Sequence, residues 1–183
     1  MALDDMREHL VLYGYYVDDW DWDFGSFWNH HYVLDEEYIS DACSTTTSSQ
    51  VTTIKFLYPF NIKKKYAIEG VIRGQFTMTA SGATSTFTSY RVTVCKVHSD
   101  DTETELFSTD WVTINDSIIW DSTYSIGDEI VYPFWIDALD EEILDENERI
   151  FVKFEFNADN NAYLLHYNDA TYNDITVDIP IRT

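Results

Sequence analysis

The chain has 183 residues, which suffice for one domain with a two-layer core that buries roughly 70% of the unfolded surface. Hydrophobic residues make up 45% and aromatic residues 16% of the chain, which argues against disorder. With 33 acidic and 11 basic residues the formal net charge is −22. This charge argues against nucleic acid and anionic membranes as partners, because both bind proteins through Lys and Arg.

The N-terminal residues 1–14 are predicted to hold a short helix. Leu3, Met6 and Leu10 recur at three- and four-residue steps, and Gly14 suits a helix stop. The same segment is charged and lacks the apolar core of a secretory signal. No apolar run in the chain approaches the length of about 18 residues that a membrane-spanning helix needs. We therefore expect neither a signal peptide nor a membrane span.

Residues 13–32 form the most unusual stretch, with nine aromatic residues, four Asp and no Lys or Arg. The stretch has no clear period, so we expect it to dock on another surface as an arm. Interface hot spots favour Trp and Tyr, which suits this composition. The predicted arm interface comprises Tyr13, Tyr15, Tyr16, Trp20, Trp22, Phe24, Phe27 and Trp28.

A polar segment follows at residues 40–50, SDACSTTTSSQ, and its small side chains are typical of a linker. We place a domain boundary there. The predicted organisation is an N-terminal arm and linker over 1–49 and a β-sandwich domain over 50–183.

After the linker, apolar and polar residues alternate in short segments separated by turns, which predicts strands. In residues 66–80, for example, Ile68, Ile72, Phe76 and Met78 share one face. The predicted strands cover residues 51–60, 66–80, 87–98, 105–114, 117–120, 130–136, 149–156, 162–167 and 174–182. This pattern predicts an all-β fold, an antiparallel β-sandwich or jelly roll of about eight or nine strands with an N-terminal aromatic-acidic arm.

Two further expectations concern the second half of the chain. Residues 137–147 are a candidate helix with Asp137 as N-cap, or alternatively a long acidic loop. Trp111, Trp120 and Trp135 are expected in the core.

Charge is distributed in blocks along the sequence. Residues 8–54 contain nine acids and no Lys or Arg, residues 55–98 contain seven bases and one acid, and residues 99–183 contain 21 acids and three bases. The basic block could receive the acidic arm of a neighbouring subunit, since opposite patches set register and partner choice. Alternatively, the fold interleaves the charges. The predicted receptor patch comprises Lys55, Lys63, Lys64, Lys65, Arg73 and Arg91.

No sequence motif indicates catalysis or metal binding. Asp19, Asp21 and Asp23 begin like a calcium loop, but Phe24 and His30 stand where an EF-hand requires Gly and Glu. The histidines lack zinc-site spacing, and no GxSxG, phosphate-binding loop or GxGxxG is present. We therefore predict a non-enzymatic protein without cofactor or metal.

We expect structural rather than catalytic roles for two His and two Cys residues. His98 and His166 are expected at strand ends, bonded to backbone. Cys43 and Cys95 are expected to be free thiols, with a single disulfide as the alternative.

Carbohydrate binding is the alternative function, because flat aromatic rings stack on sugar faces. Trp20, Trp22 and Trp28 would form the platform, and Asp19, Asp21 and Asn29 would bind hydroxyl groups.

The segments TSYRVTVCKVHSDDTETELFSTDW, YSIGDEIVYPFWI and LLHYNDATYNDITVDIPI lie within residues 86–183. In style they resemble β-sandwich structural proteins of tailed-phage virions, of the capsid-decoration or tail-accessory type. The resemblance implies a virion structural protein that acts by assembly, with symmetric homo-oligomers bound to other virion subunits such as the major capsid or tail protein. It also implies location in the virion after assembly in the host cytoplasm.

Overall fold

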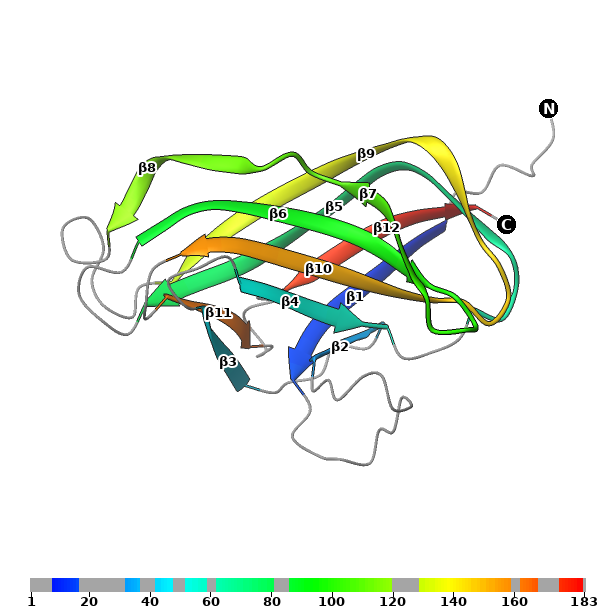
Figure 1. Cartoon of the computed structure of the whole chain (residues 1–183), viewed down its shortest axis with the longest axis horizontal. Coiled ribbons are helices and arrows are strands. Elements are labelled where there is room, and N and C mark those ends of the chain that lie inside the picture. Colours follow the sequence, from blue (N-terminus) through cyan, green and yellow to red (C-terminus); the bar gives the residue numbers. More distant parts are fainter. Residues whose placement is uncertain are drawn as a thin grey trace.

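The computed structural model describes residues 8–16, 32–36, 42–47, 52–58, 62–80, 86–119, 129–158, 162–167 and 175–182. All regular secondary structure in these ranges is β, which confirms the predicted fold class (Figure 1). The described part of the chain therefore contains no helix that could cross a membrane. The strands are β1 (Glu8–Tyr16), β2 (Tyr32–Asp35), β3 (Ala42–Thr47), β4 (Thr52–Leu57), β5 (Tyr66–Ala80), β6 (Thr86–Val97), β7 (Glu103–Ser108), β8 (Val112–Ile119), β9 (Ile130–Leu144), β10 (Arg149–Ala158), β11 (Ala162–Tyr167) and β12 (Thr176–Arg182).

The strands pair in the order β3-β11-β5-β12-β1-β2-β4-β10-β6-β7, with β8 also on β6 and β9 also on β5. Recorded pairings are antiparallel except for the parallel contact of β2 with β4, where Val33 lies opposite Leu57. Figure 1 shows β4, β6 and β10 running at an angle to β1, β5 and β12. Buried side chains of both sets share one core.

The helix predicted over residues 1–14 is wrong for the part that the structure describes, because β1 begins at Glu8. Its exposure follows a period of two: Leu12 is buried, whereas Val11 faces outward. Pairing with β12 on one edge and β2 on the other satisfies the backbone in this extended form. The boundary between 1–49 and 50–183 stays a prediction, although β1, β2 and β3 are strands of the same sheet as the rest.

The candidate helix over residues 137–147 is also wrong. β9 continues to Leu144 and pairs with β5 along its length, from Met78 opposite Ile130 to Tyr66 opposite Leu144. A buried helical stripe would include Leu139, which is instead 84% exposed. Long-range pairing with β5 therefore overrides the local helical pattern.

Trp111 and Trp135, both expected in the core, are 42% and 66% exposed. The core contains Phe134 and Ile136 instead, so Trp135 has the outward phase of the period-two alternation in β9. Trp120 lies outside the described residues.

Cys95 is a free thiol buried with Leu57, Val97 and Phe151. Burial raises the pKa of Cys95 to about 12. Because the thiolate is the reactive form, this cysteine is chemically inert in the folded protein.

An aromatic cluster forms the centre of the core. The ring of Phe76 on β5 lies 4.9 Å from that of Tyr90 and 5.4 Å from that of Phe156, measured between centroids. It also meets the ring of Phe154 edge-on at 5.7 Å, which joins β5 to β10. Nearby Gly74 has no room for a side chain, since an added Cβ would lie 2.3 Å from both Phe134 Cζ and the carbonyl oxygen of Thr176. The core therefore depends on close contact at β5.

Replacing Phe76 with Ala should lower the free energy of unfolding by roughly 3–5 kcal/mol, because it removes a fully buried ring and leaves a cavity. The outward-facing Val71→Ala on the same strand is the control and should change it by less than about 1 kcal/mol. Chemical denaturation of both variants measures the difference. Equal effects of the two substitutions would contradict the central position of Phe76.

Candidate functional site

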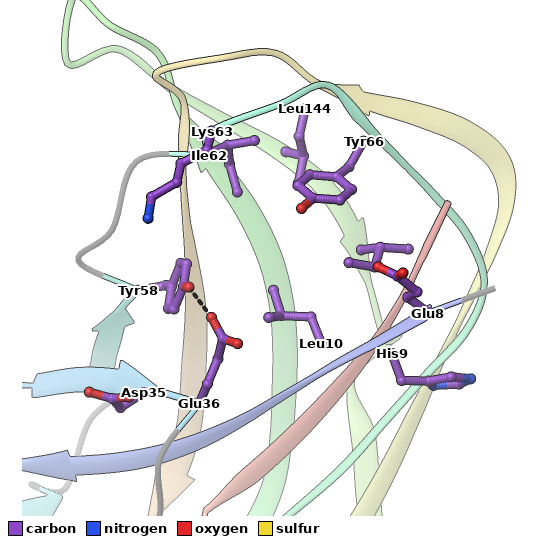
Figure 2. A pocket seen from close by; sticks show the side chains of 11 residues that line it. Glu8, His9, Leu10, Asp35, Glu36, Tyr58, Ile62, Lys63, Tyr66 and Leu144 are labelled. Carbon is purple, nitrogen blue, oxygen red and sulfur yellow. Dashed lines mark hydrogen bonds between the residues drawn. The ribbon is translucent and has the colours of Figure 1, made fainter. Parts of the chain in front are cut away.

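A hollow of about 710 Å³ lies at one end of the sandwich, where β1, β2, β4, β5, β9 and β12 begin or end. Figure 2 shows its lining side chains, which come from these separate elements. The lining residues are Glu8, His9, Leu10, Asp35, Glu36, Tyr58, Ile62, Lys63, Tyr66, Leu144 and Ile181.

The apolar part of the lining belongs to the edge of the core. Ile62, Leu144 and Ile181 are buried, and Leu10 packs against the same cluster. Pairing with β5 brings two of them together, since Tyr66 lies opposite Leu144 and Ile68 opposite Ile181. The hollow therefore has a fixed apolar wall.

Backbone hydrogen bonds hold Tyr58 and Ile62, which follow β4, at the hollow. The amide of Tyr58 donates to the carbonyl of Ile150 at 2.8 Å, and the amide of Ile62 donates to that of Glu148 at 2.9 Å. The amide of Asn147 donates in return to the carbonyl of Ile62 at 3.0 Å. These bonds extend the β4–β10 pairing and hold both lining residues in place.

Tyr58 donates its hydroxyl hydrogen to the carboxylate of Glu36 across the hollow (Figure 2). Burial raises the pKa of Tyr58 far above its ordinary value, and the hydrogen bond and charge of Glu36 and the charge of Asp35 raise it further. Tyr58 is therefore a permanent donor that fixes one oxygen of Glu36.

The charges around the hollow are unbalanced. Glu8, Asp35 and Glu36 contribute carboxylates, whereas Lys63 is the one Lys or Arg among the described lining residues. His9 is turned away and bonds through Nδ1 to Asp178 at 2.7 Å (Figure 2). No cluster of three or more potential metal ligands occurs among the described residues. The excess negative charge suits an organic cation.

The ring of Tyr66 shows how a cation can be held at this rim. The ammonium group of Lys64 lies 5.1 Å from the ring centroid, within the range of a cation–π contact. The Tyr66 ring thus already holds the Lys64 ammonium group, while Glu8, Asp35 and Glu36 line the hollow beside an apolar wall.

The structure reaches only part of the predicted arm interface. Tyr13 lies in β1, half-buried and opposite both Thr176 and Asp35. Tyr15 and Tyr16 end the same strand. Trp20, Trp22, Phe24, Phe27 and Trp28 lie outside the described residues, as do Asp19, Asp21 and Asn29 of the alternative carbohydrate platform.

The six residues of the predicted receptor patch occupy different parts of the fold. Lys55 pairs with Glu103 at 2.7 Å, and Arg91 lies 3.6 Å from Glu105, so these two bases are interleaved with acids of β7. Lys63, Lys64 and Lys65 precede β5, and Arg73 lies on the outward face of β5.

Sequence analysis did not identify Glu8, Asp35, Glu36, Tyr58 or Tyr66 as site residues. They come together through long-range pairing, in particular the parallel contact of β2 with β4. No local period or motif signals this arrangement.

A scan of protein-family models and a search of curated proteins found no match to the chain. Solved structures do match it. A CocE/NonD family hydrolase from Staphylococcus aureus shares 12% identity over 97% of this chain and 37% of its own, with TM-scores of 0.60 and 0.58 in two crystal structures. An aminopeptidase from a marine sediment Thaumarchaeota archaeon shares 10% identity over 94% and 37%, with a TM-score of 0.60.

These likenesses show a shared fold, and the chain spans about 37% of the length of the hydrolase chains. They overturn the prediction that the protein is not an enzyme, because the same architecture occurs within hydrolases and an all-β fold gives no ground to exclude catalysis. A structure of infectious bursal disease virus, Gx strain, matches at 8% identity with a TM-score of 0.35, which is too low to carry an argument.

Replacing Tyr58 with Phe should flatten the loss of stability at high pH. The pKa of Tyr58 is raised in the folded state, so its stabilising contribution is complete below the unfolded value of 10.0 and is lost as the pH rises above it. Unfolding free energies measured from pH 8 to 11 should fall less steeply for Tyr58→Phe than for the original chain. Glu36→Gln, which keeps an acceptor but removes the charge, should lie between them. Identical slopes in all three proteins would contradict the coupling.

Proposed function

We propose that this protein is a ligand-binding β-sandwich whose hollow recognises the positively charged amino end of a peptide. The observation that carries the proposal is that Glu8, Asp35 and Glu36 line one hollow in which Lys63 is the one Lys or Arg among the described lining residues. An ammonium group there would gain charge-assisted hydrogen bonds, which are stronger than neutral ones.

The remaining lining residues suit the rest of such a ligand. Leu10, Ile62 and Leu144 offer an apolar wall for the side chain beside the amino group. Tyr58 keeps Glu36 oriented before binding, so little ordering is needed when the ligand arrives.

The similar solved structures support binding of a peptide by this fold. The fold occupies about 37% of a hydrolase chain and of an aminopeptidase chain, and an aminopeptidase acts on the amino end of peptides. We therefore infer that the hollow binds the amino end of a peptide as part of a protein that hydrolyses peptides.

Isothermal titration calorimetry with trileucine amide and its N-acetylated form tests the proposal. The free amine should bind at least tenfold more tightly, because a hydrogen bond to a charged group contributes about 1.5 kcal/mol. Glu36→Gln should weaken amine binding by roughly the same factor. Glu103→Gln makes the same charge change on the surface beside Lys55 and should leave binding unaltered.

The proposal fails if both peptides bind equally, if neither binds, or if Glu103→Gln weakens binding as much as Glu36→Gln. The last result would indicate a general effect of net charge. Rising salt should weaken amine binding only moderately, since the site is partly enclosed.

Subunit assembly in a virion, with other virion subunits as partners, is a second candidate. It is favoured by three exposed apolar residues on the outward face of β9, Val131, Trp135 and Leu139, although Asp137 lies between the last two. Exposed apolar patches of this kind mark protein–protein interfaces. Among the described residues β9 pairs with β5 and also lies near β7, so a second copy of the chain would dock on the exposed side chains of β9 rather than pair with its backbone.

Sedimentation velocity of the double variant Trp135→Ser, Leu139→Ser tests assembly through this face. The original chain should sediment as an oligomer and the variant as a monomer, because the substitutions remove apolar anchors. Asp140→Ser, exposed on the same strand, is the control. A monomeric original chain, or an oligomer unaffected by the double substitution, would rule out this interface.

A further inference from the structure

A second chemical cluster lies outside the hollow, where the β6–β7 hairpin meets the start of β10. His98 Nδ1 lies 2.7 Å from Glu148 Oε1, and His98 Nε2 lies 2.9 Å from Thr104 Oγ1. The ring nitrogens thus connect a carboxylate on one side to a hydroxyl group on the other. Sequence analysis expected His98 to bond to backbone, whereas its ring bonds to two side chains.

Strand register places the three side chains on one face. Val97 lies opposite Arg149 of β10, so Glu148 comes beside His98. Lys96 lies opposite Thr104 of β7, so Thr104 is the diagonal neighbour of His98. Three adjacent strands therefore fix the cluster.

Burial and hydrogen bonding of Glu148 determine which ring nitrogen of neutral His98 carries the hydrogen. Glu148 is only 7% exposed, and its Oε2 accepts the backbone amide of Asp145 at 2.9 Å. Lys96 Nζ lies 3.7 Å from the same oxygen. A carboxylate only accepts, so in the neutral form of the imidazole the hydrogen is on His98 Nδ1 and Nε2 is the acceptor for the Thr104 hydroxyl.

We propose that Thr104 is a nucleophile for acyl transfer, with His98 as general base and Glu148 as the residue that positions it. Thr104 is exposed, so a carboxylic ester can reach its Oγ1. The Oγ1–carbonyl bond forms while His98 Nε2 takes the hydroxyl proton. The ester C–O bond then breaks, and the leaving alkoxide receives that proton. Water releases the acyl group by the same two steps.

Neighbouring Thr102 provides a matched comparison. Its hydroxyl group donates to Asp100 Oδ1 at 2.6 Å rather than to an imidazole. Hydrogen bonds from Thr102 hold the pKa of Asp100 below its ordinary value, which makes that carboxylate a weak base. Thr102 shares the hairpin and its exposure with Thr104 but lacks the base.

The test is covalent labelling of the full-length chain with diisopropyl fluorophosphate, mapped by peptide mass spectrometry. Its P–F bond breaks as the bond from Oγ1 to phosphorus forms, and the hydroxyl proton leaves with fluoride. We expect label on Thr104 in the original chain, in Thr104→Ser and in Thr102→Val. We expect none at this position in Thr104→Val, and a labelling rate roughly 100-fold lower in His98→Gln.

A hydroxyl group that only ties the hairpin together would give a different pattern. Label absent from Thr104 in the original chain, or equal label on Thr102 and Thr104, overturns the proposal. An unchanged labelling rate in His98→Gln also overturns it. Circular dichroism of Thr104→Val, which keeps the side-chain shape, establishes that the fold is retained.

Discussion

The structure depends on the pairing of β5 along both of its edges. β9 lies along one edge, and β12 followed by β11 lies along the other. The close approach of Gly74 to Phe134 and to the backbone of Thr176 requires that no side chain intervene at this point. The same pairing sets the ring of Phe76 against the rings of β6 and β10. β5 thus joins the two sides of the core, and its register fixes where the neighbouring strands end.

The hollow is a consequence of how these strands end. The register of β5 brings Tyr66 beside Leu144, and the short parallel contact of β2 with β4 brings Glu36 toward Tyr58. Since burial costs a charged group solvation, carboxylates gather at the open mouth of the core rather than within it. The rigid core therefore presents an acidic mouth with an apolar wall, which is the arrangement expected for recognising a cation beside an apolar side chain.

Period-two alternation was sufficient to predict the all-β class and most strands, because half-buried strands place apolar residues at every second position. It failed where long-range pairing overrides local pattern. The helical spacing of Leu3, Met6 and Leu10 runs into β1, and Asp137, which suits a helix N-cap, lies inside β9. The alternation of side chains along β9 could have predicted that Trp135 faces outward, since Phe134 and Ile136 on either side of it are buried. The hollow could not be predicted, because Glu36, Tyr58 and Tyr66 share no local pattern and meet only through the sheet topology.

The central claim is that the acidic mouth, rather than the outward face of β9 or the β6–β7 hairpin, binds an amino group. Mapping backbone amide shifts by NMR during titration with an amine-ended peptide tests this most directly. The account predicts that the largest shifts occur at Glu36, Tyr58 and Tyr66 and that the N-acetylated peptide produces none there. Shifts centred on Trp135 or His98, or equal shifts with both peptides, would contradict it.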